Sequence, residues 1–325
     1  MKISVALCTY NGSVFLEQQI NSILNQTIPV NEIVVCDDVS SDNTVSILEK
    51  YNIEHPNLFS IHINETNLRS NKNFEKAIAL CTGDYIFLSD QDDLWKTNKV
   101  EETLRIFNEN STAEGVFSNG ELIDENNNII FEDTSLWDSV YFFESKMQKP
   151  IDLFRLLILK SNYLTGATLC IKKEVKEFCF PFKTTLKTFL HDEWFAMLLS
   201  NRNTLFYTTE KLISYRIHSQ QQIGVGEIEK NRKIAKDLPK SFKLMMGFQK
   251  ATTFNDFKLL TRNLYKLYIK HKESELCSEK NPLNIKIEEK IKGYYLEADR
   301  KMKKANPLFY FFRKWEDKRK GKRQL

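Results

Sequence analysis

Short apolar runs alternate with amphipathic segments along the first part of the chain. The runs at 3–8, 32–36, 58–63 and 85–88 are bounded by polar or turn-forming residues and predict β-strands. Between them, apolar residues recur at helical spacing and predict three helices: one carrying Phe15, Ile20, Ile23 and Leu24, one capped by Asp42, and one over 73–81. Strands that alternate with helices predict an α/β domain with a parallel sheet covered on both faces.

Polar clusters follow three of the predicted strands. They are Thr9-Tyr10-Asn11, Asp37-Asp38-Val39-Ser40 and Ser89-Asp90-Gln91-Asp92-Asp93. Because the carboxyl ends of parallel strands lie along one edge of a sheet, we expect these clusters to converge on one crevice. The chain has no G-x-G-x-x-G after the first strand and no G-x-x-x-x-G-K-[ST], which argues against a dinucleotide-binding enzyme and a P-loop NTPase.

Three carboxylates lie within four residues at the last of these strand ends. Asp90, Asp92 and Asp93 are expected to need a cation among them, because like charges about 4 Å apart repel by several kcal/mol at an effective dielectric of about 20. Mg²⁺ or Mn²⁺ takes oxygen ligands and commonly bridges to substrate phosphates. The pattern predicts a divalent-metal site, with a solvated acidic turn as the alternative interpretation.

Five motifs, in order and spacing, resemble glycosyltransferase family two, and in particular its bacterial rhamnosyltransferase-like members. The resemblance covers about residues 1–226 and implies the GT-A fold, a Rossmann-like, mostly parallel sheet with helices on both faces, here followed by a helical C-terminal appendage. The motifs are Val5 to Gly12, Ile33 to Thr44 with Gly83 to Trp95, Thr165-Gly166-Ala167-Thr168, His191-Asp192-Glu193-Trp194 and Ser214-Tyr215-Arg216-Ile217-His218.

The resemblance also implies a donor site and a metal site. It places the base and ribose of a nucleotide-sugar against Asp38 and the first polar cluster, and the metal at Asp92, Asp90 and His218, with Asp90 nearer the ribose. For His218 an ordinary surface histidine is the alternative. Where relatives carry a glycine before the third helix, this chain has Arg69, which could supply a cation to the diphosphate. The implied donor-binding residues are Thr9, Tyr10, Asn11, Asp38, Lys72, Asn73, Asp90 and Gln91.

Asp192 matches the general base of inverting members of the family. A carboxylate at this place would take the proton of the acceptor hydroxyl as that hydroxyl attacks the anomeric carbon. Because Phe195, Leu198 and Leu199 follow at helical spacing, capping of a helix is the alternative role for Asp192. Trp194 is expected either at the acceptor site or in the core.

Charge divides the chain into two regions of opposite sign. Residues 227–325 hold 27 Lys and Arg against 13 Asp and Glu, so this region carries +14, while residues 1–226 carry −10 of the chain's net +4. Within the basic region, Phe257, Leu260, Leu264 and Leu267 predict an amphipathic helix whose polar face holds Lys258, Arg262, Lys266 and Lys270. We therefore expect a catalytic domain at 1–226 and a basic helical region at 227–325.

Aromatic residues stand beside basic ones near the end of the chain, from Leu308 through Trp315 to Arg323. This combination suits the interface of an anionic membrane, where each cation contributes about 1 kcal/mol. A packed helix with a solvated basic end is the alternative, and no recognition motif supports nucleic-acid binding. No run approaches the length of a spanning helix, and no signal peptide is recognised.

Six scattered cysteines without a C-x-x-C pair predict reduced thiols and a cytoplasmic location. The aromatic and basic residues near the end of the chain add an expected peripheral contact at the inner face of the cytoplasmic membrane. Asn126-Asn127-Asn128 predicts a hairpin turn. A boundary at 142–150 leads into the acceptor-binding half, so that 1–110 form the nucleotide-sugar half and 111–226 the acceptor half.

Together these features predict an inverting, metal-dependent glycosyltransferase. The resemblance implies dTDP-rhamnose as the donor, with a UDP-hexose as the second candidate, and the expected acceptor is a lipid-linked glycan such as an O-antigen or capsule precursor. A sugar-phosphate nucleotidyltransferase is one alternative, but it needs a Gly-rich basic loop that Cys8 to Gly12 do not supply. A non-catalytic glycan-binding protein is the other, and the presence of both Asp92 and Asp192 speaks against it.

Overall fold

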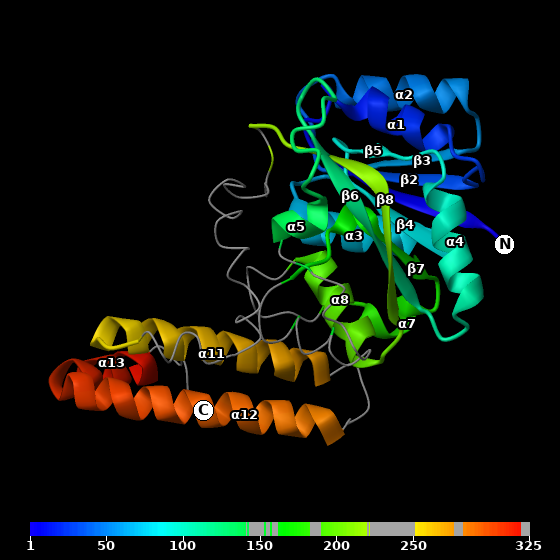
Figure 1. The fold of residues 1–325 in the computed structure, drawn as a ribbon. Helices are drawn as coiled ribbons and strands as arrows, with labels where there is room; N and C mark the ends of the chain where they lie inside the picture. Colours follow the sequence, from blue (N-terminus) through cyan, green and yellow to red (C-terminus); the bar gives the residue numbers. More distant parts are fainter. Residues whose placement is uncertain are drawn as a thin grey trace.

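The computed structural model describes residues 1–140, 142, 153, 157, 162–182, 190–219, 221, 251–275 and 282–319. One sheet organises the first part of the chain, with strand order β3-β2-β1-β4-β7-β6-β8-β5 (Figure 1). Its strands are β1 (Ile3–Thr9), β2 (Glu32–Asp37), β3 (Phe59–Ile63), β4 (Tyr85–Ser89), β5 (Leu94–Trp95), β6 (Gly115–Ile123), β7 (Leu169–Lys172) and β8 (Leu205–Arg216).

Strand direction changes halfway across this sheet. The four strands expected from the sequence, β3, β2, β1 and β4, pair in parallel, as predicted. Strand β7 pairs antiparallel with both β4 and β6, and the short β5 pairs antiparallel with β8. The sheet is therefore mixed, and its parallel half places the polar ends of β1, β2 and β4 along one edge.

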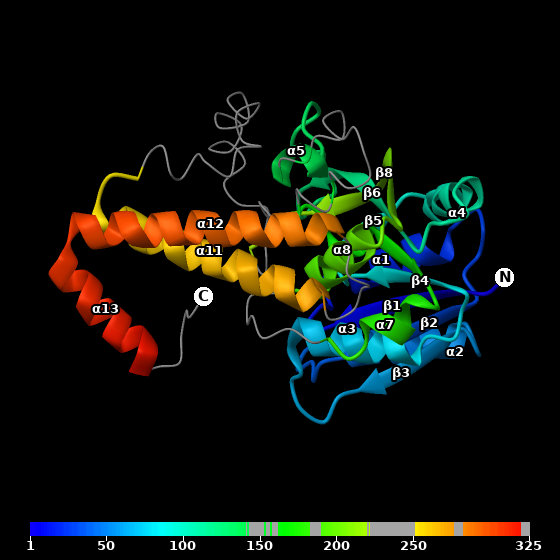
Figure 2. The same cartoon turned by 90° about the horizontal axis from the view of Figure 1, so that it is seen from below.

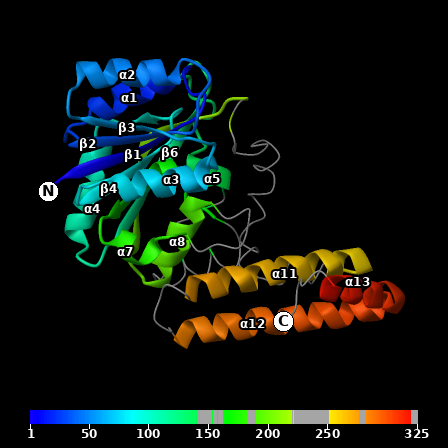
Figure 3. The same ribbon diagram turned by 180° about the vertical axis from the view of Figure 1, so that it is seen from behind.

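Helices cover both faces, as expected for buried parallel strands. Alternate residues of β1 face opposite layers. Val5 belongs to the core on the face covered by α1 (Leu16–Leu24), α2 (Thr44–Glu54) and α4 (Lys99–Glu109). Ala6 belongs to the core on the other face, which is covered by α3 (Arg69–Leu80), α7 (Val175–Cys179) and α8 (His191–Asn201). Figure 3 shows α3, α7 and α8 together on the second face. Short segments α5 (Leu136–Val140) and the 3-10 helix η2 (Gly166–Thr168) lie near the crevice.

Helix α3 begins four residues before the predicted start at Asn73. Asp38 is the reason, because its carboxylate accepts the N–H groups of Leu68 at 2.7 Å and Arg69 at 2.8 Å and so replaces the hydrogen bonds that a helix start lacks. Arg69 has φ of 64°, a left-handed conformation that favours glycine. Arg69 therefore adopts at this turn a backbone conformation that glycine takes more readily.

The basic region forms three helices, α11 (Phe254–Glu275), α12 (Pro282–Ala305) and α13 (Pro307–Arg319). Helices α11 and α12 lie side by side along their length, and α13 folds back at their far end (Figure 2). The amphipathic helix predicted from Phe257 and Leu264 is confirmed, since both side chains are buried. Lys270, expected on the solvent face, is instead buried and pairs with Glu193 of α8.

Two smaller predictions have mixed outcomes. The segment at Asn126-Asn127-Asn128 is a turn, with Asn127 at φ of 68°, but it is followed by one isolated bridge from Ile123 to Ile129 rather than by a second strand. Of the predicted boundary at 142–150, residues 143–150 lie outside the described part of the chain, which leaves the division into halves a prediction. Among the described helices, none combines the length and apolar character needed to span a bilayer.

Candidate active site

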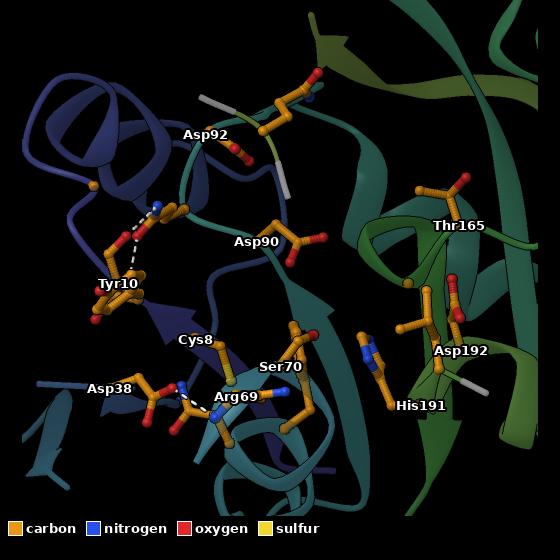
Figure 4. A pocket seen from close by; sticks show the side chains of 18 of the residues that line it. Cys8, Tyr10, Asp38, Arg69, Ser70, Asp90, Asp92, Thr165, His191 and Asp192 are labelled. Carbon is orange, nitrogen blue, oxygen red and sulfur yellow. Dashed lines mark hydrogen bonds between the residues drawn. The ribbon is translucent and has the colours of Figure 1, made fainter. Parts of the chain in front are cut away.

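A cavity of about 990 Å³ opens at the carboxyl edge of the parallel strands. It is lined by residues from β1, the β2–α2 and β4–β5 loops, the start of α3, η2, the start of α8 and the segment after β8. Figure 4 shows Asp90 near the middle, with Asp38, Arg69 and Tyr10 on one side and Asp192 on the other. The convergence of the three polar clusters is therefore confirmed. The predicted site residues on this lining are Thr9, Tyr10, Asn11, Asp38, Asn73, Asp90, Gln91, Asp92, Asp192 and His218.

Lys72 is the predicted site residue that this lining lacks. Its ammonium donates to Glu75 one turn later on α3 at 2.6 Å, and its side chain is largely exposed. The neighbouring Asn73 is buried, with its amide donating to Cys36 O at 2.8 Å and its oxygen accepting from Asn64. Consecutive residues of a helix point in different directions, so Asn73 lines the cavity while Lys72 points away from it.

The loop after β1 is held by side chains from two other strand ends. Gln91 accepts the N–H of Tyr10 at 2.8 Å and donates to its carbonyl at 3.0 Å, so its carboxamide mimics a neighbouring strand. Asn11, at φ of 49°, donates its N–H to Ser40. A Cβ at Gly12 would lie 2.1 Å from the Gln91 Oε1, so a larger residue there would displace the carboxamide that holds Tyr10. Tyr10 itself stays half exposed over the cavity, where its ring can stack on a flat ligand.

The acidic edge of the cavity is made by Asp90 and Asp92. Burial, together with the negative charges of Asp92 and Asp192, raises the pKa of Asp90 to about 7. The imidazole Nε2 of His218 lies 3.0 Å from Asp92 Oδ2, although the two residues are 126 positions apart. Sequence reasoning placed both residues at one metal site, and the fold brings them into contact.

Beneath this edge lie two buried cations whose roles were not predicted from the sequence. Arg216, fully buried, donates from its guanidinium to Asp92 O at 2.7 Å and to Asp124 O at 3.0 Å, and its N–H donates to Asp93 Oδ1. Lys99 is also buried, and its ammonium lies 4.3 Å from the centre of the Trp95 ring. Burial lowers the pKa of Lys99 to about 7, while the charge of Asp93 opposes that shift. Asp93 thus orients the turn instead of facing the cavity. The sequence signal for the role of Arg216 was an arginine at the end of an apolar strand, two positions before His218.

The residues at the acidic edge fit a divalent cation held jointly with a ligand. No group of three His, Cys, Asp or Glu side chains within the described ranges is arranged to hold an ion by itself. Asp92 and His218 nevertheless offer one carboxylate oxygen and one imidazole nitrogen at a single point. Mg²⁺ sites typically use one or two carboxylates and take their remaining ligands from water and substrate phosphates. The donor set of Asp92 and His218 matches that pattern.

Asp192 stands on the opposite wall, in the first turn of α8. Its carboxylate accepts the N–H of Glu193 at 2.6 Å, and hydrogen bonds from Asn162 and from the Gly166 N–H also reach it. Burial raises the pKa of Asp192 to about 7, and these hydrogen bonds partly oppose the rise. A carboxyl group that ionises near neutral pH can act as a general base there. Trp194, by contrast, is fully buried and donates to Cys179 O, so it is a core residue.

His191 forms the floor between the two walls. Its ring stacks on Phe74 at 3.9 Å between centroids, and burial lowers its pKa to about 3, which keeps the imidazole neutral. A Cβ at Gly166 would lie 2.6 Å from the His191 Nε2. The glycine of the Thr165 to Thr168 motif therefore allows the loop that hydrogen-bonds Asp192 to close over this ring.

The chain is similar to proteins that transfer sugars. A family model described as Glycosyl transferase family 2 matches residues 4–163. The dTDP-rhamnosyl transferase RfbG of Shigella flexneri is 28% identical over 240 residues, which span 68% of this chain and 74% of that protein. Chondroitin synthase of Escherichia coli is 33% identical over 128 residues, or 39% of this chain and 18% of that one.

Solved structures agree on the fold. The structure of S. aureus TarS residues 1–349 in complex with UDP-GlcNAc superposes with a TM-score of 0.56 at 15% identity, covering 99% of this chain and 93% of that one. The same TarS fragment with UDP gives a TM-score of 0.52 at 16% identity, covering 93% and 91%. The likeness extends beyond the catalytic sheet and includes the helical C-terminal region.

Proposed function

Because this chain is a glycosyltransferase of family 2 with the GT-A fold, we propose that it transfers a sugar, with inversion, from a nucleoside diphosphate donor to a hydroxyl of a growing surface polysaccharide. The observation that carries the proposal is the placement of Asp192. It lies buried in the first turn of α8, across one cavity from the acidic edge at Asp90 and Asp92. An acceptor hydroxyl and a donor phosphate can therefore occupy opposite sides of the same space.

Asp192 performs the proton transfer in the proposed reaction. The acceptor oxygen forms its bond to the anomeric carbon as its proton passes to the Asp192 carboxylate, while the bond from that carbon to the diphosphate oxygen breaks on the opposite face. Attack from the face opposite the leaving group inverts the anomeric configuration. A positioned base contributes about 10²–10⁴-fold to such a step, and hydrogen bonds from Gly166 and Asn162 keep the carboxylate oriented.

The donor side of the cavity is assigned to the nucleotide. Tyr10 would stack on the base, and Asp38, whose oxygens are already held by the α3 turn, would accept from the base or ribose. Asp92 and His218, with Asp90 beside them, would hold Mg²⁺ or Mn²⁺. That ion would neutralise charge on the departing diphosphate. Arg216 holds the acidic turn from beneath through its hydrogen bonds to the Asp92 carbonyl and the Asp93 carboxylate.

The finer identity of the substrates follows the relatives. We propose dTDP-rhamnose as the donor, on the 28% identity to RfbG, with a UDP-hexose as the second candidate. The proposed acceptor is a lipid-linked glycan at the inner face of the cytoplasmic membrane. A reducing compartment agrees with the five described cysteines, which are all free and buried, while Cys277 lies outside the described residues.

The decisive experiment compares Asp192→Asn with the parent protein. The amide retains the shape of the side chain but cannot take a proton, so transfer should fall by about 10²-fold or more while donor affinity changes little. NMR of the product should show inverted anomeric configuration. If Asp192→Asn keeps full turnover at saturating donor, Asp192 is not the general base. A product of retained configuration would refute the inverting mechanism.

A further inference from the structure

Helix α13 turns its apolar face to solvent. The side chains of Leu308, Phe311, Phe312 and Trp315 are 60–74% exposed. At 3.6 residues per turn these four positions fall within an arc of about 100° on one side of the helix. Phe309, 63% exposed, extends the same face and lies 6.0 Å from the ring of Phe254. The helix therefore presents a continuous aromatic surface, called here the α13 aromatic face.

The opposite side of α13 carries its polar residues and packs inward. Arg313 and Asp317 are buried and lie 3.5 Å apart one turn from each other, and Arg313 also donates to Thr261 of α11 at 2.9 Å. Tyr310 donates to Asp299 of α12 at 2.7 Å. Ion pairs and hydrogen bonds thus fix the helix by its polar side. This orientation is the reverse of a helix that folds against a protein core, where the apolar stripe is buried.

Cations surround the α13 aromatic face. The Lys303 ammonium lies 5.6 Å from the Phe311 ring, and the Arg319 guanidinium lies 5.0 Å from the Trp315 ring. Lys304, in the last turn of α12, and Lys318, in the last turn of α13, are also exposed. The surrounding region carries +14, whereas the remainder of the chain carries −10. Exposed aromatics among lysines and arginines match the headgroup region of an anionic bilayer, where rings enter the interface and cations pair with lipid phosphates.

We propose that the α13 aromatic face docks on an anionic lipid surface, with Leu308, Phe311, Phe312 and Trp315 entering the interface. This docking goes beyond the proposed sugar transfer and does not depend on it, because the residues concerned lie outside the catalytic cavity. An aromatic face of this size exposed to water is otherwise unfavourable, and the hydrogen bonds of Arg313 to Thr261 of α11 and of Tyr310 to Asp299 of α12 prevent the helix from rotating to bury it.

Docking through α13 would also set the direction of the catalytic domain. Strand β1 runs from the N-terminus toward the side on which α11, α12 and α13 project, so the carboxyl edge with the cavity faces that side (Figures 1 and 3). The helical pair is attached to the domain by the buried contact of Lys270 with Glu193 and by Ile291 in the main core. A lipid surface beneath α13 would therefore lie on the side from which a lipid-linked acceptor enters.

The natural tryptophans provide a direct test. Trp95, Trp137 and Trp194 are buried, so Trp315, which is 60% exposed, is the tryptophan whose surroundings lipid binding would change. Adding phosphatidylglycerol vesicles to the full chain should shift its emission to shorter wavelength, and lipids brominated on their acyl chains should quench it. Pure phosphatidylcholine vesicles should give a smaller effect. Binding should weaken as salt rises, because charge attraction is screened within about 10 Å at 0.1 M.

Two variants separate docking from folding. Phe312→Ala should weaken co-sedimentation with phosphatidylglycerol vesicles about tenfold, since it removes one ring from the interface while leaving the buried polar side of α13 intact. Ile53→Ala, an equally exposed apolar change on α2, should bind vesicles as the parent does. Vesicle binding unaffected by Phe312→Ala would overturn the proposal. So would self-association in the absence of lipid that Phe312→Ala abolishes, because the face would then belong to a second copy of the chain.

Discussion

Lys270 of α11 forms a buried ion pair with Glu193, the residue that follows Asp192 on α8. Its ammonium also donates to Leu157 O, and its side chain is 6% exposed. The C-terminal helices are therefore joined to the catalytic helix beside the proposed base. Glu193 raises the pKa of Asp192 by its charge, so the Lys270 ammonium that neutralises Glu193 also limits that effect.

Lys270→Met should destabilise the protein by about 3 kcal/mol, because it leaves the partly buried Glu193 carboxylate and the Leu157 carbonyl without the ammonium that pairs with them. Urea denaturation measures this, and Lys270→Met with Glu193→Gln should recover part of the loss in a double-mutant cycle. Lys292→Met is the matched control, since Lys292 pairs with Glu288 at the surface and its removal should cost about 1 kcal/mol or less. Equal losses for Lys270→Met and Lys292→Met would contradict a buried role for Lys270.

Transfer should rise with pH through about 7, because Asp192 must be ionised to act as base and its pKa is raised to about 7. The effect of rising pH on the stability of the fold has the opposite sign. A carboxyl whose pKa is raised by folding binds more protons when folded than when unfolded, so ionising it lowers stability as pH increases from about 4 to about 7. A pH profile of kcat/KM and unfolding curves over the same range test both statements. In Asp192→Asn, the fall in stability that Asp192 causes between about pH 4 and pH 7 should disappear. A rate of the parent enzyme that is independent of pH between 5 and 8 would contradict the assignment of Asp192 as the base.

Divalent metal should strengthen nucleoside diphosphate binding through Asp92. Calorimetry with dTDP and UDP should show weak binding in EDTA and tighter binding with Mn²⁺ or Mg²⁺, because the ion bridges the carboxylate and the phosphates. Asp92→Asn should remove the difference. Asp84→Asn, at the amino end of β4 and so at the opposite edge of the sheet, should leave it unchanged. Equal affinities of the parent protein with and without metal would rule out this site.

Gly166→Ala should reduce turnover while the protein stays folded. The added Cβ would lie 2.6 Å from the His191 Nε2 and 3.5 Å from the Asp192 Cβ, so either the ring or the loop must move. Steady-state kinetics should show a lower kcat with little change in donor affinity. Gly293→Ala is the matched control: nothing lies within 4 Å of its Cβ in α12, so it should keep full activity and gain up to about 1 kcal/mol of stability. Full turnover in Gly166→Ala would show that the loop can yield without disturbing Asp192.

The sequence alone predicted the parallel half of the sheet and its polar edge. Strands of parallel sheets are short apolar runs buried on both sides, and this signal is local, so 3–8, 32–36 and 85–88 were found to within a residue or two. The convergence of Thr9, Asp38 and Asp90 followed from strand direction. The helix that carries Asp192 in its first turn followed from the spacing of the apolar residues after it.

Contacts between distant segments decided what the sequence left open. The Asp38 carboxylate accepts the N–H of Leu68 at the start of α3, and the Arg216 guanidinium donates to the Asp92 carbonyl. These groups are 30 and 124 residues apart and meet only after the sheet has formed. Lys72 matched a motif, yet the rotation of α3 turns it toward Glu75. Motif spacing gives the order of side chains along an element, but the direction in which that element presents them depends on what it packs against.

For the C-terminal region, composition determined that helices would form and that they would be basic. Tertiary structure decided which faces are buried. Periodicity shows that Leu308, Phe312 and Trp315 share a side of α13, and by itself it would place that side inward. The hydrogen bonds of Arg313 to Thr261 and of Tyr310 to Asp299 instead hold the polar side against α11 and α12. Whether a surface is buried depends on all the contacts that it can make with the rest of the chain, and a local sequence pattern does not hold this information.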